Sequence, residues 1–316
     1  MRTRTLGWTG VKLSTIGVGT WAMGGGGWKF SWGPQDDEDS IRAIRRAVDL
    51  GVNWIDTAAV YGLGHSEEVI GKALRGLSKR LFVATKCSRC WDEKGEPLSR
   101  LKRASVRAEA EASLRRLGVD VIDLYQIHWP MPEEDIEEGW GAIAELVKEG
   151  KVRFAGVSNF SVAQLKRIQP IHPVASLQPP YSLLQRDVES ELLPYCAANQ
   201  IGVIVYSPMQ KGLLTGKMTP DKAQSFAADD HRRRDPQFNE PKLSMNLALV
   251  ESLKAIAGKT GHTAGQLALA WVLRRPEVTG AIVGTRNPAQ IEETSPEGDW
   301  SLTAAEIAQI DALLKS

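Results

Sequence analysis

Four side chains that could move a proton follow apolar, strand-like segments of this sequence. Asp56 and Tyr61 come after NWI, Lys86 after LFVAT, and His128 after VIDLYQI. A tyrosine has a pKa of about 10 in water, too high for efficient proton transfer at neutral pH, and a nearby ammonium would lower it. Asp56 is placed to hold the charge of Lys86, and a histidine can hydrogen-bond a substrate oxygen or relay a proton. Each residue alone would as often be structural, but together they predict an activated proton donor.

An apolar segment followed by a helix-like one recurs eight times along the chain. Amphipathic patterns at 40–50 and 136–150 illustrate the helices. Apolar strands separated by helices indicate a parallel sheet buried on both faces, and eight such units predict a closed (β/α)8 TIM barrel with its chemistry at the carboxyl ends of the strands. The predicted strands are residues 14–20, 53–58, 81–87, 121–128, 152–159, 175–182, 201–207 and 280–285.

Two segments lie outside this repeat. Residues 4–14 predict an N-terminal β-hairpin, and residues 209–243 form a long polar loop after the seventh strand. A loop of that length is usually functional or disordered. Because no segment has the composition of a linker, residues 1–316 are predicted to form one domain.

The composition argues against several classes of protein. Of the 316 residues 42% are apolar, and the net charge of +1 comes without a basic stretch interleaved with aromatic residues, so we expect no nucleic-acid partner. No segment approaches the roughly 18 apolar residues of a membrane span, and the first ten residues lack the apolar core of a signal peptide. We therefore expect no membrane partner and a cytoplasmic location. Three cysteines cannot form a disulfide framework, which agrees with a reducing compartment.

Two short motifs are weak signals. GVGTWA (17–22) matches the dinucleotide-binding fingerprint, but the glycine-rich segment after it cannot open the helix that this fingerprint requires. CSRC (87–90) has the spacing of a zinc half-site or a redox pair, yet there is no second pair and Cys196 is distant. We predict no metal site, and leave open whether Cys87 and Cys90 have a redox role, in which their oxidation next to Lys86 would inactivate the protein.

The segments DTAAVYG, ATKC and QIHWP resemble the signature segments of the aldo-keto reductase superfamily. The sequence is most similar to a bacterial branch related to potassium-channel β subunits and to glycerol and general-stress reductases. The resemblance implies a (β/α)8 barrel over nearly the whole chain. It also implies a catalytic tetrad of Asp56, Tyr61, Lys86 and His128, with a hydride passing from a nicotinamide to a carbonyl carbon while the tyrosine protonates the oxygen.

The resemblance further implies a cofactor site built largely from the later strand ends. Hydroxyl and amide side chains there can bracket a carboxamide, and a tyrosine ring can stack on a flat heterocycle. The family lays the segment 207–217 across the pyrophosphate and uses the last barrel strand and helix for the adenosine phosphate, where Thr294 replaces a frequent asparagine. The implied contacts are Thr20, Trp21, Asp56, Ser158, Asn159, Gln178, Tyr206, Ser207, Pro208, Gly212, Lys217, Gly284, Thr285, Arg286, Gln290 and Glu293.

Arg286 predicts NADPH rather than NADH. The two cofactors differ by a phosphate on the adenosine ribose, and the planar guanidinium can make two charge-assisted hydrogen bonds to it. No acidic residue occupies 284–287 to repel the phosphate. Without the family resemblance, Arg286 would equally be a solvated arginine, and the basic run 231–236 is equally a phosphate contact or an exposed charge run.

Tryptophans in segments at the presumed catalytic rim predict an aromatic substrate pocket suited to flat or hydrophobic carbonyl compounds. Met131 stands where close relatives often carry an acidic residue, which bears on substrate choice. The four tryptophans at the rim are Trp21, Trp32, Trp91 and Trp129.

Three functions are compatible with these residues. The first is an NADPH-dependent reductase of a small aldehyde or ketone, with Tyr61 as general acid. A Schiff-base aldolase that uses Lys86 would not need the cofactor residues. A redox-sensing subunit like the channel β subunits would bind the cofactor and regulate a partner. Substrate, reaction direction and oligomeric state are left open.

Overall fold

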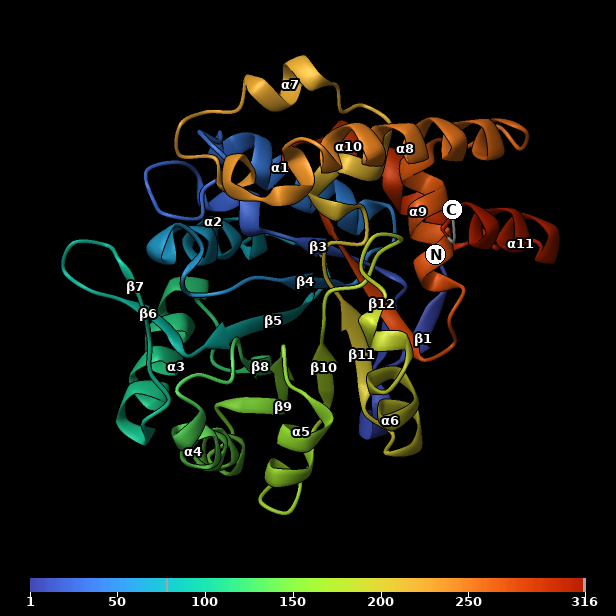
Figure 1. Cartoon of the computed structure of the whole chain (residues 1–316). Coiled ribbons are helices and arrows are strands. Elements are labelled where there is room, and N and C mark those ends of the chain that lie inside the picture. The colour runs from blue at the N-terminus through green and yellow to red at the C-terminus, as the bar shows by residue number, and fades with distance from the viewer. Residues whose placement is uncertain (78, 315–316) are drawn as a thin grey trace.

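A closed barrel of eight parallel strands forms the centre of the molecule, with neighbours in the order β10, β11, β12, β3, β4, β5, β8, β9. The computed structural model describes residues 1–77 and 79–314, and helices surround the barrel (Figure 1). The predicted (β/α)8 barrel is confirmed, and β12 begins two residues earlier than expected. The barrel strands are β3 (Ile16–Gly19), β4 (Trp54–Asp56), β5 (Phe82–Cys87), β8 (Ile122–Ile127), β9 (Val152–Ser158), β10 (Ser176–Gln178), β11 (Gly202–Val205) and β12 (Val278–Gly284).

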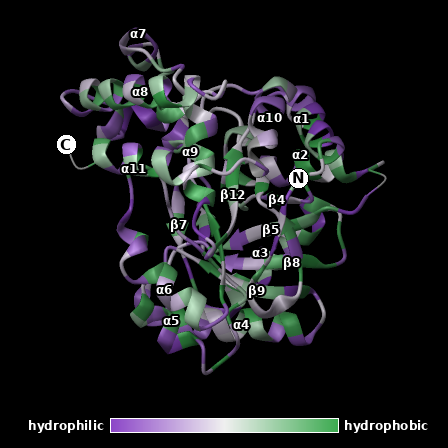
Figure 2. Ribbon diagram, turned by 90° about the vertical axis from the view of Figure 1, so that its right-hand side faces the viewer, coloured by the Kyte–Doolittle hydropathy of each residue, from purple (hydrophilic) through white to green (hydrophobic). Residues whose placement is uncertain are grey.

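Amphipathic helices shield the outside of the barrel, so the strands are largely hydrophobic while the helices mix both kinds of residue (Figure 2). The predicted helices at 40–50 and 136–150 are α1 and α4, and α1 begins after Asp36, whose side chain caps a backbone N–H of the first turn. The α-helices are α1 (Asp37–Asp49), α2 (His65–Leu74), α3 (Arg103–Leu117), α4 (Ile136–Lys148), α5 (Val162–Ile168), α6 (Leu192–Ala198), α7 (Pro220–Gln224), α8 (Lys242–Gly258), α9 (Ala264–Leu273), α10 (Pro288–Thr294) and α11 (Ala304–Leu313).

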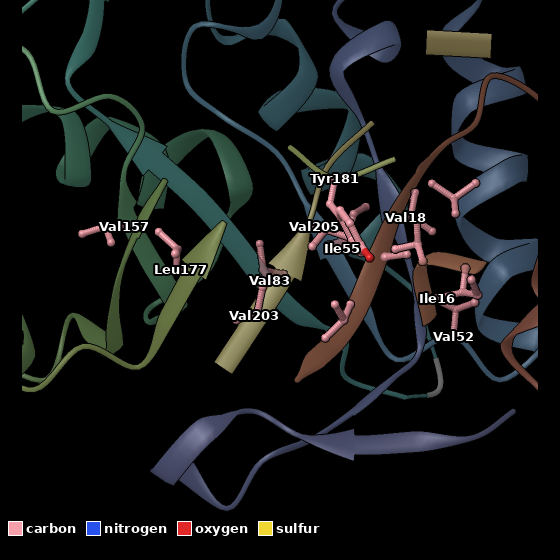
Figure 3. Packing of buried hydrophobic residues seen from close by; sticks show 14 of the residues in the cluster. Ile16, Val18, Val52, Ile55, Val83, Val157, Leu177, Tyr181, Val203 and Val205 are labelled. Carbon is pink, nitrogen blue, oxygen red and sulfur yellow. The ribbon is translucent and has the colours of Figure 1, made fainter. Parts of the chain in front are cut away.

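The alternation of side chains along each strand decides which residues face the barrel axis. On β5, Phe82 and Ala84 pack in the barrel interior, whereas Val83 and Cys87 join the core between strands and helices. The same alternation turns Lys86 inward at the carboxyl end of the strand. Figure 3 shows part of the outer core, with Val18, Ile55, Val83, Val157, Leu177 and Val203 among its labelled residues.

The predicted N-terminal hairpin is confirmed and closes the amino end of the barrel. Strands β1 (Thr3–Thr5) and β2 (Lys12–Ser14) pair in antiparallel fashion, and the hairpin passes beneath the barrel strands (Figure 3). Leu6 and Leu13 are fully buried there against Trp54, whose indole N–H donates to the carbonyl of Ser14 at 2.8 Å. The barrel interior is therefore filled from below by side chains of the hairpin.

The long connection after β11 contains short helices and has a small core of its own. It contains the 3-10 helices η6 (Gln210–Thr215), η7 (His231–Arg234) and η8 (Pro236–Phe238), together with α7, before α8 begins. Lys211 also pairs with Asp235 at 2.7 Å across the connection. The buried apolar residues of this segment are Leu213, Met218, Ala223, Phe226, Phe238 and Leu243.

The glycine-rich segment after β3 forms no α-helix, as expected. One 3-10 turn, η2 (Trp21–Gly24), follows the strand, and the chain then bends until α1. The helix that a dinucleotide-binding fingerprint requires therefore does not begin at 17–22. Among the helices of the described residues, none has the length and apolarity needed to cross a bilayer.

Candidate active site

A buried carboxylate and ammonium form the base of the candidate site. Lys86 Nζ donates to Asp56 Oδ1 at 2.6 Å and to the carbonyl of Thr57 at 2.8 Å, and both charged residues are at most 2% exposed. Asp56 Oδ2 accepts from Gln178 Nε2 at 2.8 Å. Burial lowers the pKa of Lys86, while the neighbouring Asp56 raises it. Each charge thus depends on the other, because a buried charge without a partner is costly.

Tyr61 lies over this pair, in the 3-10 segment η3 (Tyr61–Gly64) that follows β4. Lys86 Nζ is 5.3 Å from the centroid of the tyrosine ring. The His128 ring stands almost perpendicular to the tyrosine ring, with centroids 5.8 Å apart. The structure thus brings together the four residues that the sequence singled out as proton-transfer groups.

The expected direction of the Tyr61 pKa shift is wrong. Burial raises the pKa of Tyr61 well above its usual value, and the charges of Asp56 and Tyr206 raise it further. Lys86 does not reverse this because Asp56 largely cancels its charge at 2.6 Å. The phenol therefore keeps its proton at neutral pH, the state required to protonate a substrate oxygen.

His128 is a neutral imidazole on the same rim. Its pKa lies well below the usual value because of burial first, and then because of the positive charges of Lys86 and Arg89. Its backbone N–H donates to the carbonyl of Cys87 at 3.0 Å, and its carbonyl accepts from Asn159 Nδ2 at 3.0 Å. A neutral imidazole donates from one nitrogen and accepts at the other. His128 can therefore orient a substrate oxygen without competing for the proton of Tyr61.

Hydroxyl and amide groups from the next strands continue this network. Ser158 Oγ donates to the Gln178 carbonyl at 2.8 Å, and Asn159 Nδ2 donates to Ser158 Oγ at 3.0 Å. The Tyr206 hydroxyl donates to Asn159 Oδ1 at 2.9 Å. Since Gln178 also reaches Asp56, the residues expected around the nicotinamide amide are joined to the catalytic carboxylate by hydrogen bonds.

Sequence reasoning missed Gln126, which is buried on β8 and faces Asp56 Oδ2 at 3.4 Å. It also accepts from Gln178 Nε2 at 3.4 Å. The signal was available, because the alternation along β8 places Gln126 on the same side as Leu124 of the barrel interior. A polar residue at an inward position near a strand end should therefore have been added to the site.

The whole barrel matches one protein family. The sequence fits the family model described as the Aldo/keto reductase family over residues 15–315. The chain belongs to this family. Its members are oxidoreductases that use nicotinamide cofactors, so this chain is an oxidoreductase of that kind.

Relatives of this aldo/keto reductase are similar over almost their full length. The chain is 40% identical over 311 residues to the aldo-keto reductase YhdN of Bacillus subtilis (strain 168), with 98% of this chain and 92% of the relative covered. It is 35% identical over 307 residues to an NADH-specific methylglyoxal reductase of Escherichia coli (strain K12), with 93% and 92% covered. The solved structure of a glycerol dehydrogenase from Gluconobacter oxydans superposes with a TM-score of 0.89 at 40% identity, covering 99% of this chain and 94% of that chain.

In this aldo/keto reductase, Arg286 is not a freely solvated arginine. Its Nε donates to Gln35 Oε1 at 2.6 Å, and its terminal nitrogens donate to the carbonyls of Trp32, at 3.4 Å, and Pro34. Three of its five N–H donors are used in this way, which leaves two for an anion. The Arg286 backbone N–H donates to Gln290 Oε1 at 2.8 Å. Gln290 therefore lies over the predicted phosphate-binding turn.

The other residues expected near the phosphates take several positions. Lys217 and Glu293, predicted from separate segments, form an ion pair with each other. Thr285 is buried and donates its hydroxyl to the carbonyl of Asn287 at 3.0 Å, while Gly284 is exposed. Three more of the predicted cofactor residues lie at the start of the long connection: Ser207 and Gly212 have positive φ, and Pro208 is buried. Thr20 lies after β3, and its hydroxyl donates to the carbonyl of Asp56.

Two of the four predicted rim tryptophans, Trp21 and Trp32, pack together beside Tyr61. Trp21 lies nearly parallel to the Tyr61 ring at 6.1 Å, and Trp32 is 5.5 Å from Trp21. Trp91 instead lies under the guanidinium of Arg116 at 5.9 Å, on a separate hairpin formed by β6 (Arg89–Trp91) and β7 (Pro97–Ser99). Trp129 is 40% exposed and Met131 is 50% exposed. The sequence missed Trp28, whose ring is 6.4 Å from that of Tyr61.

The cysteines of CSRC face away from the barrel axis. Cys87 is fully buried in the outer core, and burial raises its pKa well above the usual value. Burial likewise raises the pKa of Cys90 to about 11. Because the thiolate is the reactive form, these environments argue against a reactive dithiol at neutral pH. Across residues 1–77 and 79–314, no group of three or more His, Cys, Asp and Glu side chains could hold a metal ion.

Proposed function

We propose that this aldo/keto reductase reduces a small aldehyde or ketone with NADPH, using Tyr61 as the general acid. The observation that carries the proposal is the convergence of a protonated phenol, a neutral imidazole and a buried ion pair at the carboxyl ends of three adjacent barrel strands. General acids of this kind contribute about 10²–10⁴-fold to a rate.

The residues present fit a nicotinamide cofactor. The joined Ser158, Asn159 and Gln178 offer the donors and acceptors that a carboxamide needs, and the Tyr206 ring stands beside them. Gly284 leaves open space after β12, since a Cβ there would meet no atom within 4 Å. When bound, the nicotinamide supplies the hydride for the carbonyl carbon.

The protein residues handle the proton. The substrate carbonyl oxygen would accept hydrogen bonds from the Tyr61 hydroxyl and from His128, which polarise the carbonyl. Tyr61 then transfers its proton to this oxygen. The Lys86 ammonium, 5.3 Å from the ring and held in place by Asp56, offsets only part of the cost of the resulting buried phenolate.

The aldolase alternative is disfavoured by the state of Lys86. A Schiff base forms from a neutral amine with a free lone pair. Lys86 Nζ donates instead to Asp56 and to the Thr57 carbonyl. The ion pair therefore favours a positioning and electrostatic role for this lysine.

NADPH is proposed because Arg286 keeps two N–H donors for a phosphate beside a turn that carries no acidic residue. One relative is named NADH-specific, so cofactor choice needs a direct test. We expect Arg286→Ala to weaken NADPH binding by tens-fold and to leave NADH binding nearly unchanged, since charge-assisted hydrogen bonds contribute about 1.5–3 kcal/mol each.

The measurement is the dissociation constant of each cofactor, from quenching of tryptophan fluorescence, together with kcat/KM for a panel of aldehydes and ketones. Arg153→Ala is the matched control, because Arg153 is 49% exposed at the start of β9, toward the opposite end of the barrel. Equal wild-type affinity for both cofactors, or equal losses in the variant, would refute the choice of NADPH. Absence of cofactor-dependent reduction with the whole panel would refute the carbonyl reductase.

A further inference from the structure

The side chain of Gln126 bridges two residues of the site from the interior of the barrel. Its Nε2 donates to Asp56 Oδ2 at 3.4 Å, and its Oε1 accepts from Gln178 Nε2 at 3.4 Å. Gln126 has no exposed surface, so a bound substrate or cofactor does not touch it. Its influence on the reaction must therefore pass through Asp56 and Gln178.

The strand order explains how one side chain reaches both partners. Asp56, Gln126 and Gln178 lie on β4, β8 and β10, with β5 and β9 between them, and side chains of alternate strands meet in one layer of such a barrel. On β9 the register partner of Gln126 is Gly156. A Cβ on this glycine would lie 3.1 Å from Gln126 Cγ. The missing side chain at 156 thus leaves room for Gln126 to cross toward Gln178.

Asp56 decides the direction of both amides. A carboxylate only accepts hydrogen bonds, so Nε2 of Gln126 faces Asp56 and its Oε1 faces Gln178. Gln178 Nε2 also donates to Asp56 Oδ2, at 2.8 Å, so its two N–H groups serve Asp56 and Gln126. The carbonyl oxygen of Gln178 is then the end left for the amide of a nicotinamide.

We propose that Gln126 is a positioning residue for carbonyl reduction, which orients the amide of Gln178 and gives Asp56 a second N–H donor. At 3.4 Å its two contacts exceed the usual N–H···O length of about 2.7–3.2 Å, so Gln178 remains the main partner of Asp56 Oδ2. Asp56 Oδ1 meanwhile holds Lys86. The inference rests on the proposed function, because its effect is measured as turnover.

The first variant, Gln126→Leu, fills a similar volume and removes both contacts. We expect kcat to fall about tenfold, because Asp56 and Gln178 each lose a buried hydrogen-bond partner. The KM of the carbonyl substrate should stay within about twofold, since Gln126 does not contact the substrate. The melting temperature of the purified variant shows whether it is folded.

The second variant uses the charges around this position. Asp56 of β4 and Lys86 of β5 lie on one side of Gln126, while β9 and β10 contribute Gly156 and the uncharged Gln178 on the other. His128, two residues further along the chain, is neutral because burial and the charges of Lys86 and Arg89 lower its pKa. A negative charge introduced at 126 would therefore face a carboxylate whose ammonium is already shared.

Gln126→Glu introduces such a charge only when the new carboxyl group ionises. Protonated, this group donates to Asp56 and accepts from Gln178, as the amide does. Burial and the carboxylate of Asp56 raise the pKa of such a group above its usual value of about 4.3. Relative to the wild type at the same pH, kcat should be nearly normal at about pH 5.5. It should fall toward the Gln126→Leu value by about pH 9, because the added charge opposes a phenolate at Tyr61.

A matched control removes a buried hydrogen-bonding group at the amino end of the barrel. Thr279, near the start of β12, is 4% exposed, and its hydroxyl accepts from the backbone N–H of Val203 at 3.2 Å. Thr279→Val keeps the shape of the side chain. It should lower the melting temperature and leave kcat and its pH dependence unchanged.

Two results would overturn the inference. A wild-type kcat in folded Gln126→Leu means that Gln126 only fills the barrel. Equal losses of kcat in the two Gln126 variants at about pH 5.5 mean that its hydrogen bonds do not matter. Both results require a wild-type protein that reduces carbonyl compounds. They are therefore distinct from failure of the proposed function, in which the wild type itself shows no reduction.

Discussion

The two ends of the barrel bury different kinds of side chain on the same strands. At the amino end, Leu6 and Leu13 of the hairpin pack against Trp54, and the indole N–H of Trp54 is satisfied by Ser14. At the carboxyl end, two residues further along β4, Asp56 is buried with Lys86. The catalytic end therefore buries a charged pair, while the hairpin fills the amino end with apolar side chains.

The difference shows that distance along a strand decides the role of an inward-facing residue. Phe82 and Lys86 both point toward the barrel axis from β5. The first adds apolar burial, which stabilises the fold by about 25 cal/mol per Å² removed from water. The second requires a partner, because a buried ion pair contributes little net stability and is costly when broken. Changes at the mouth should therefore act mainly on turnover, and changes at the amino end mainly on stability.

The largest expected effect is on catalysis at the mouth. Tyr61→Phe removes one hydroxyl and retains the ring that packs beside Trp21 and His128. We expect kcat to fall about 10²–10⁴-fold while thermal stability and cofactor affinity change little. Turnover of a good aldehyde substrate, together with the melting temperature, checks this. A purified variant that retains near-normal kcat would show that another group supplies the proton.

A smaller effect, on stability, is expected at the amino end. A Cβ on Gly17 would lie 2.1 Å from the Trp54 ring, which is held in place by its hydrogen bond to Ser14. Gly17→Ala should lower the free energy of unfolding by about 3 kcal/mol, because an overpacked core must shift. The kcat of the folded fraction should be nearly unchanged.

Denaturant unfolding measures this, with Gly141→Ala in α4 as the control. A Cβ at Gly141 meets no atom within 4 Å, so alanine should add about 0.5–1 kcal/mol through its helix preference. Equal stability changes at the two positions would contradict the packing argument. A large loss of kcat in the folded Gly17 variant would contradict the division between the two ends.

The smallest predicted effect is a change in the free energy of unfolding that depends on pH. Glu109 of α3 lies beside Cys90 and Ser105, and burial raises its pKa to about 7. A raised carboxyl pKa means that the folded state binds a proton which the unfolded state releases above its ordinary pKa of about 4.5. The cost of burying this carboxylate is therefore absent below about pH 4.5, grows as the pH rises from about 4.5 to about 7, and stays constant above that range.

Glu109→Gln should thus stabilise the protein by about 2 kcal/mol at pH 8 and by little at pH 4.5. Unfolding at both pH values tests the sign. Glu111→Gln on the same helix is the control, since Glu111 is 41% exposed and pairs with Lys151 at the surface, and its effect should stay within about 0.5 kcal/mol. Destabilisation by Glu109→Gln at pH 8 would mean that the carboxylate is well solvated or paired.

Local patterns in the sequence were enough to predict the barrel and the meeting of its four proton-transfer groups. Strand alternation is a local property, and parallel strands closed in a ring bring their carboxyl ends together. Asp56, Lys86 and His128 were therefore placed correctly from their positions at three strand ends. The same rule, applied more strictly, would have added Gln126.

Long-range contacts decided the rest, because no local pattern encodes them. The Tyr61 pKa rises since burial outweighs an ammonium that Asp56 has already neutralised. His231 reaches Trp21 from the far side of the sequence, and Arg286 is held by carbonyls of residues 32 and 34. Such pairings depend on how the loops cross above the barrel, which is set by packing of the whole chain and not by the period of any one segment.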